Sequence, residues 1–131
     1  MKAFKSSLFL GLMLNFSLVF AHGMNKPGPN GGEIRMPGPF HTEAKAEGAN
    51  KLKVYLLDMN FKNPVTANSS VEVTFSGHHK TKASCEKSKD YFLCSFEGGV
   101  DLQKEGTIEI KAVRDSKKGS IATYKTPLMA K

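Results

Sequence analysis

Tryptophan is absent from this sequence of 131 residues, and cysteine occurs only as Cys85 and Cys94. The missing tryptophan excludes the buried Trp that packs on the inter-sheet disulfide of antibody domains. The eight residues between the two cysteines exclude a C-x-x-C redox motif. The chain also lacks G-x-S-x-G, Walker and H-E-x-x-H motifs and has no convincing acid/base carboxylate pair. We therefore predict that the protein is not an enzyme.

Arginine is nearly absent, since only Arg35 and Arg114 stand among 19 basic residues, against 12 acidic residues. Surfaces that bind phosphates or bases usually carry arginine forks. The lysines instead alternate with acidic and polar residues, as on solvated strand faces and on edge strands protected against aggregation. We predict no nucleic-acid binding.

The only long apolar run extends from Leu8 to Phe20 and has 13 residues, fewer than the ~20 of a membrane-spanning helix. It follows Lys2 and Lys5 and ends in Val19-Phe20-Ala21, which is the three-part plan of a secretory signal. We expect cleavage after Ala21, with a retained N-terminal anchor as the alternative. The mature chain would then be periplasmic or secreted, have no integral membrane span, and carry a net charge of +5, because Lys2 and Lys5 are lost from the +7 of the whole chain.

After the signal peptide (1–21), the chain divides into a leader rich in proline and glycine (22–39) and a domain (40–131). In the domain, apolar residues alternate with polar ones, and no window keeps a helical stripe. Leu52, Val54 and Leu56, for example, alternate with Lys51, Lys53 and Tyr55. The pattern predicts an all-β, immunoglobulin-like β-sandwich of seven or eight short antiparallel strands.

Cys85 and Cys94 form an even pair in a chain expected to be exported, which predicts a disulfide. They lie in the predicted strands 81–86 and 91–96, which flank a polar turn over 87–90. Pairing of these strands would bring the two cysteines opposite each other as a staple of one hairpin. A thiol metal pair is the alternative.

The placement of the histidines suggests a metal site. A mature chain that begins at His22 offers its α-amine and its imidazole to one ion, and such nitrogen donors suit Cu(II). His41 and Glu43 are two residues apart on a predicted strand, so they share a face and could converge on one ion. Each has an ordinary alternative: His22 as an accident of cleavage, and His41 with Glu43 as a solvent-facing pair.

Four further residues complete the candidate ligand set. His78 and His79 follow Gly77, and because neighbouring strand residues face opposite ways, at most one should join a given site. The alternative for both is a polar loop. Met24 and Met36 offer soft thioethers that favour Cu(I), with packing as their alternative.

Three segments resemble a group of small bacterial exported domains. These segments are Gly28-Pro29-Asn30-Gly31-Gly32, His41-Thr42-Glu43 and Val54-Tyr55-Leu56-Leu57-Asp58. The group is related to periplasmic heavy-metal efflux adaptor segments and to YtkA-like and FixH-like domains. The resemblance, best over residues 22–75, implies an immunoglobulin-like fold and a partner in an envelope or heavy-metal efflux assembly. A second resemblance, to copper-resistance sandwich proteins with a mature N-terminal histidine, concerns the chemistry alone.

Two functions follow as hypotheses. The first is an exported copper-binding protein for storage, buffering or hand-over of the ion, with His22 as its anchor. The second is a non-catalytic interaction module that docks on an envelope or efflux assembly through its lysine-rich strands or its leader.

Overall fold

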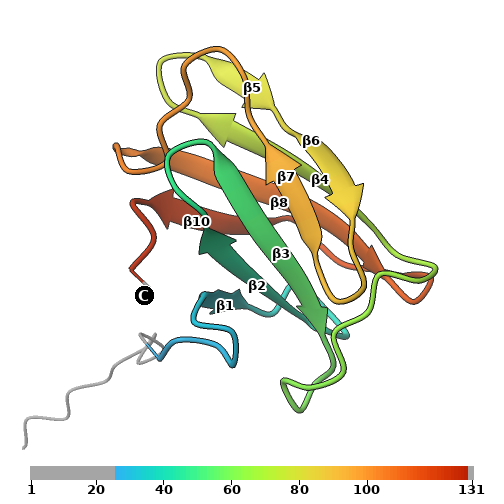
Figure 1. The fold of residues 1–131 in the computed structure, drawn as a ribbon. Coiled ribbons are helices and arrows are strands. Elements are labelled where there is room, and N and C mark those ends of the chain that lie inside the picture. The colour runs from blue at the N-terminus through green and yellow to red at the C-terminus, as the bar shows by residue number, and fades with distance from the viewer. Residues whose placement is uncertain (1–25, 130–131) are drawn as a thin grey trace, which may run out of the picture.

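The computed structural model describes residues 26–129 and folds them into two antiparallel β-sheets packed face to face (Figure 1). The predicted signal peptide, its cleavage site, His22 and Met24 lie outside these residues. Residues 26–129 include no helix that could span a membrane. The strands are β1 (Glu33–Arg35), β2 (His41–Ala46), β3 (Lys51–Leu57), β4 (Ser70–Ser76), β5 (Lys80–Lys82), β6 (Ser84–Lys87), β7 (Phe92–Ser95), β8 (Gly106–Arg114), β9 (Lys117–Lys118) and β10 (Ala122–Thr126).

The strand order confirms the predicted immunoglobulin-like sandwich. One sheet, here sheet A, has the order β1-β2-β3-β7-β6, and the other, sheet B, has the order β10-β8-β4-β5, with β9 paired to β8. Without the short β1 and β9, this matches the ABED and GFC sheets of immunoglobulin domains, except that β5 and β6 together take the place of one strand. The chain changes sheets at Ala83, whose N–H still donates to the Val73 carbonyl at 2.9 Å. That switch and the two short additions explain why the described residues form ten strands instead of seven or eight.

The alternating residues predicted to face inward fill the space between the sheets. Leu52, Val54 and Leu56 are fully buried, as are Val73, Ile108 and Ile110 of sheet B. Tyr124 of β10 reaches across to sheet A, where its hydroxyl lies 2.7 Å from Thr42 Oγ1 and donates to the Thr42 carbonyl at 3.1 Å. This buried hydroxyl is therefore satisfied, and it ties the two sheets together.

The predicted disulfide is confirmed. Cys85 of β6 lies opposite Cys94 of β7 in the strand register, and the two sulfur atoms are bonded. Cys94 is fully buried in the core. The bridge links neighbouring strands of sheet A and not the two sheets, as the hairpin prediction required.

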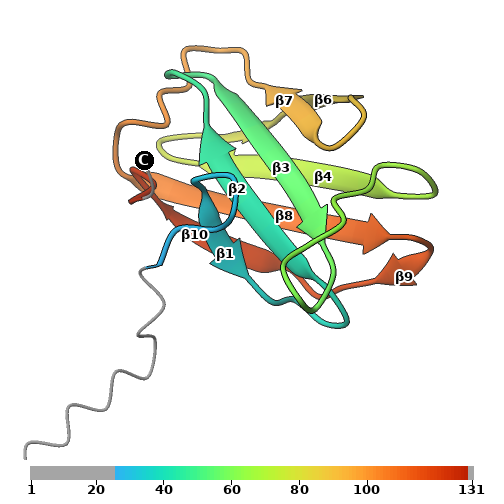
Figure 2. The same cartoon turned by 60° about the horizontal axis from the view of Figure 1, so that its bottom comes forward.

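The loops gather at two opposite ends of the sandwich (Figure 2). The register pairs His41 with Leu57 and Ser70 with Val113, so the loops 36–40 and 58–69 share one end with segment 115–121, which includes β9. We call this end the Phe61 end. The pairs Ala46–Leu52 and Ser76–Thr107 mark the other end, with loops 47–50, 77–79 and 96–105, which we call the cleft end.

Candidate functional site

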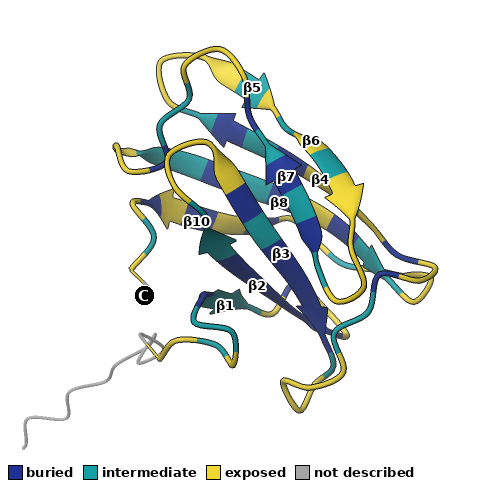
Figure 3. Cartoon of the chain, in the orientation of Figure 1, coloured by how far each residue is buried: buried dark blue, intermediate teal, exposed yellow. Residues whose placement is uncertain are grey.

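The first four residues of strand β2 (41–44) are buried on both faces of the strand, which is unusual in a two-layer sandwich (Figure 3). Thr42 and Ala44 face the core, as the alternation predicted. His41 and Glu43 face away from it, yet they are only 6% and 0% exposed. The alternative of a solvent-facing pair is therefore wrong, because the leader and the β3–β4 loop cover this part of sheet A.

The Glu43 carboxylate holds the leader in place. Its Oε2 accepts hydrogen bonds from the backbone N–H of Asn30 (2.9 Å) and Gly32 (2.7 Å), and its Oε1 accepts one from Asn30 Nδ2 (2.9 Å). A Cβ on Gly28 would lie 2.5 Å from the Glu43 side chain, and one on Gly32 would lie 2.8 Å from it. The glycines of the Gly-Pro-Asn-Gly-Gly segment thus leave room for the carboxylate that their loop binds.

His41 supports the β3–β4 loop. Its Nδ1 lies 3.1 Å from the Asp58 carbonyl oxygen, and because a carbonyl only accepts, Nδ1 carries the proton. In the neutral imidazole, Nε2 is then the nitrogen with the lone pair. The His41 ring stacks on the Phe61 ring, with centroids 4.0 Å apart and planes 19° from parallel.

Phe61 occupies the left-handed backbone region with φ 61°, where bulky side chains are rare. Asn63, two residues later, has φ 54°. The turn is closed by hydrogen bonds from the Phe61 N–H to the Asp58 carbonyl (3.0 Å) and from the Asp58 N–H to the Lys62 carbonyl (2.8 Å). Contacts around this loop therefore hold a backbone conformation that Phe would not adopt alone.

The Asp58 carboxylate caps the same loop. It accepts hydrogen bonds from the N–H groups of Asn60 (2.8 Å) and Lys62 (2.9 Å) and from Asn63 Nδ2 (2.7 Å). The bonds from Lys62 and Asn63 stabilise the charged form most and lower the pKa of Asp58 below its ordinary value, and Arg114 adds to the shift.

Arg114, at the end of β8, fastens the loop to sheet B. Its Nε donates to the Leu56 carbonyl (3.1 Å), and its Nη2 donates to the Asn63 carbonyl (2.7 Å). The β3–β4 loop is thus fixed from sheet A by His41, from sheet B by Arg114, and from within by Asp58.

This fixed loop presents apolar side chains to solvent. Met59 is 50% exposed and Phe61 45% exposed. Met36, at 59%, directly follows β1, and the register that pairs Arg35 with Thr42 brings it beside His41. Three of the five exposed large apolar side chains among residues 26–129 therefore lie on loops 36–40 and 58–69. A fourth, Ile121 of segment 115–121, lines a cleft with Glu72 and Lys111 of sheet B instead.

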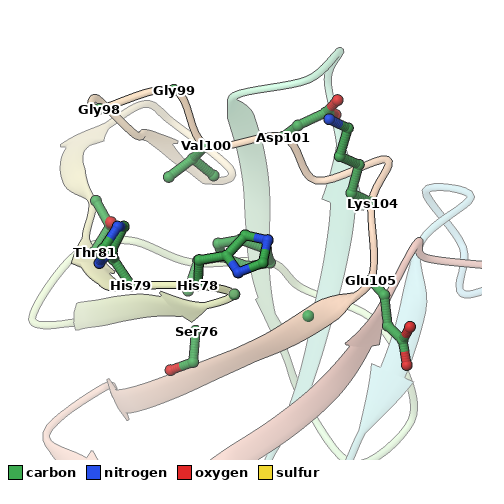
Figure 4. Close-up of a pocket in the computed structure, with 13 residues that line it drawn as sticks. Ser76, His78, His79, Thr81, Gly98, Gly99, Val100, Asp101, Lys104 and Glu105 are labelled. Atoms are coloured by element: carbon green, nitrogen blue, oxygen red, sulfur yellow. The ribbon is translucent and has the colours of Figure 1, made fainter.

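The remaining predicted ligands lie elsewhere. His78 and His79 are exposed in the β4–β5 loop, which agrees with the alternative of a polar loop. They lie beside a cleft with a volume of about 570 Å³ at the cleft end. Figure 4 shows the two imidazoles pointing in different directions, in agreement with the prediction that at most one could join a given site. Within residues 26–129, no three His, Cys, Asp or Glu side chains are grouped closely enough to hold a metal ion.

Sequence reasoning missed Asp58, Phe61 and Arg114 as parts of one site. The segment Asp58-Met59-Asn60-Phe61-Lys62-Asn63-Pro64 does carry a signal, because Asp and Asn favour side-chain-capped turns and Asn-Pro marks a turn. It predicts a tight loop at this position. It does not reveal the stacking on His41.

The geometry defines a class: a small, disulfide-stapled immunoglobulin-like sandwich that presents a rigid apolar loop at one end. Protein-family models, curated proteins and solved structures contain no significant match to the chain. The resemblance to exported and efflux-related domains stays a prediction. Its three motifs nevertheless meet in this protein, since Glu43 binds the glycine loop and His41 bonds to Asp58.

Proposed function

We propose that the protein is an exported, non-catalytic interaction module that docks on a component of the cell envelope through its Phe61 end. The observation that carries the proposal is Phe61, an aromatic residue held at φ 61° with its side chain 45% exposed.

The cost of this conformation supports a functional role. A non-glycine residue held in a sparsely populated backbone region costs on the order of 1–3 kcal/mol, and such residues concentrate at binding and active sites. Glycine at position 61 would avoid the strain without removing the turn. Phenylalanine instead adds an apolar surface next to Met59, and methionine is common on adaptable binding surfaces.

Site-specific photo-crosslinking tests the proposal. A photoreactive residue replaces Met59 in the full chain, and the cells that produce the protein are irradiated before purification. We expect an adduct of defined mass at position 59. Met129, 66% exposed and outside the Phe61 end, is the matched control position. Equal adducts at positions 59 and 129, or none at 59, would overturn the proposal.

Copper binding at His22 is the second candidate function. One observation supports it. His41 donates its Nδ1 proton to a backbone carbonyl, which is the usual orientation of metal-binding histidines and leaves Nε2 as the ligand atom. Because His22 precedes Gly28 by six residues, a site built on His22 would lie within about 20 Å of Gly28.

Native mass spectrometry of the exported chain with added Cu(II) tests this candidate. We expect one tightly bound ion per chain that starts at His22, and loss of that ion when one residue is added before His22, because the α-amine is then an amide. The His78→Ala variant is the control and keeps the ion. A mature chain that starts elsewhere, or that binds no copper, would exclude this function without affecting the docking proposal.

A further inference from the structure

We propose that the surface on which the Phe61 end docks is an anionic lipid bilayer, with Met36, Met59 and Phe61 entering the interface between headgroups and acyl chains. The inference rests on the proposed function and specifies its partner.

The form of the Phe61 end favours a bilayer over a protein partner. A stable protein interface covers about 800 Å² on each partner with some 20–30 residues. Here Met36, Met59 and Phe61 project from two neighbouring loops, whereas Ile121 of segment 115–121 lies beside Lys111 of sheet B. The β3–β4 loop extends beyond the strands (Figure 1). A bilayer interface accepts a few projecting apolar side chains without a complementary shape.

The charges at the two ends favour the same orientation. The loops of the Phe61 end and the residue that fastens them carry five basic residues and three aspartates: Lys62, Lys89, Arg114, Lys117, Lys118, Asp58, Asp90 and Asp115. Lys89 and Asp90 belong to the β6–β7 turn, which the Thr66 hydroxyl joins to this end by bonding the Ser88 carbonyl (2.7 Å). The loops of the cleft end carry four acidic residues and one lysine, and the strand residues that border them add Lys51 and Lys80: Glu47, Glu97, Asp101, Glu105, Lys104, Lys51 and Lys80. An anionic surface would therefore attract the first end more strongly than the second.

The fixed loop lowers the cost of docking. His41, Arg114 and Asp58 hold Met59 and Phe61 in place before contact, so binding loses little conformational entropy. Lys62 follows Phe61 and is exposed, so its ammonium can stay among the headgroups while Phe61 enters.

Vesicle co-sedimentation of the full chain tests the inference, with vesicles of phosphatidylcholine alone or mixed with phosphatidylglycerol in equal parts. We expect binding to the mixed vesicles at least tenfold tighter than to phosphatidylcholine, and weaker binding as salt rises. Met59→Ser should weaken binding by about five- to tenfold because it removes apolar burial, whereas Met129→Ser should leave it unchanged. Lys117→Glu with Lys118→Glu should weaken it by about tenfold or more, and Lys104→Glu should not.

Equal binding to both vesicle types, or equal loss in the Met59 and Met129 variants, would overturn the bilayer proposal. A protein adduct from position 59 together with no vesicle binding would also overturn it while the proposed docking function stands. A lipid adduct from position 59 supports both. If position 59 gives no adduct at all, the proposed docking function itself is overturned.

Discussion

His41 and His78 lie at opposite ends of the same sandwich and differ in almost every physical respect. His41 is 6% exposed, bonds to Asp58 and stacks on Phe61. His78 is exposed beside a cleft whose rim contains Gly98 and Gly99, both with positive φ. A Cβ added to either glycine would meet nothing within 4 Å, whereas Gly28 and Gly32 have no room for one.

The comparison separates two uses of the same residue types. Around His41, the glycines, the histidine and the carboxylate hold the leader and the β3–β4 loop in place. The loop that they fix presents apolar side chains to solvent. Around His78, glycines provide turns and the polar side chains stay in water. Residue type alone therefore does not identify a ligand, because the Glu43 carboxylate already accepts three hydrogen bonds and so has a structural role.

Glu43→Ala should give the largest difference in unfolding free energy between a change in one region and a matched change in the other. The change leaves three donors without their acceptor, two of them backbone N–H groups, so we expect a loss of about 3 kcal/mol in unfolding free energy. Urea unfolding measures it. Glu105→Ala at the cleft end is the matched control, with an effect within about 0.5 kcal/mol because Glu105 is exposed. Glu43→Gln, which keeps the shape, should fall between them; equal effects of Glu43→Ala and Glu105→Ala would refute the role of Glu43.

Arg114→Ala should have the next largest effect. It removes one hydrogen bond to the Asn63 carbonyl of the β3–β4 loop and one to the Leu56 carbonyl at the end of β3. We expect a loss of about 2 kcal/mol together with faster amide exchange in residues 58–63. Lys104→Ala, which removes a cation at the cleft end, is the control and should leave both quantities unchanged. If the loop amides exchange no faster in the Arg114 variant, the loop is held by other contacts.

Gly98→Ala should show that the cleft end depends on backbone freedom and not on packing. With φ 73° and open space around the added Cβ, the cost is conformational and about 1 kcal/mol. Thermal unfolding of this variant beside Glu97→Ala, a neighbouring exposed change, measures it. An unchanged midpoint would mean that this turn adopts another conformation in solution.

Acid should loosen the Phe61 end, as the smallest of the four effects. The folded pKa of Asp58 lies below its ordinary value of 3.8, so its contribution is complete above that value and is lost as the pH falls through the folded pKa. NMR signals of the Asn60 and Lys62 amides, which donate to this carboxylate, should therefore change below pH 3.8. Asp58→Asn should abolish the transition and Asp101→Asn should retain it; a transition centred near neutral pH would exclude Asp58 as its cause.

Much of the fold could be predicted because it is encoded in short-range patterns. The alternation in Leu52, Val54 and Leu56 predicts a strand with one buried face, and the spacing of Cys85 and Cys94 about a polar turn predicts the staple. Both depend only on the two-residue period of a strand and on the reach of a disulfide. The same reasoning failed for His41 and Glu43, since alternation assigned them an outer face but could not show that this face is covered.

From the sequence alone come the all-β class, the alternation that separates core from surface, the disulfide-linked hairpin and the turn propensity of the segment after Asp58. Only the tertiary structure decides that Glu43 holds the leader, that His41 lies under Phe61, and that Arg114 of β8 joins them. The reason is physical: strand period, turn chemistry and capping act between neighbours in the chain, whereas these contacts join residues brought together by the packing of two sheets. Arg114 and Leu56 are 58 residues apart, and no local pattern carries their hydrogen bond.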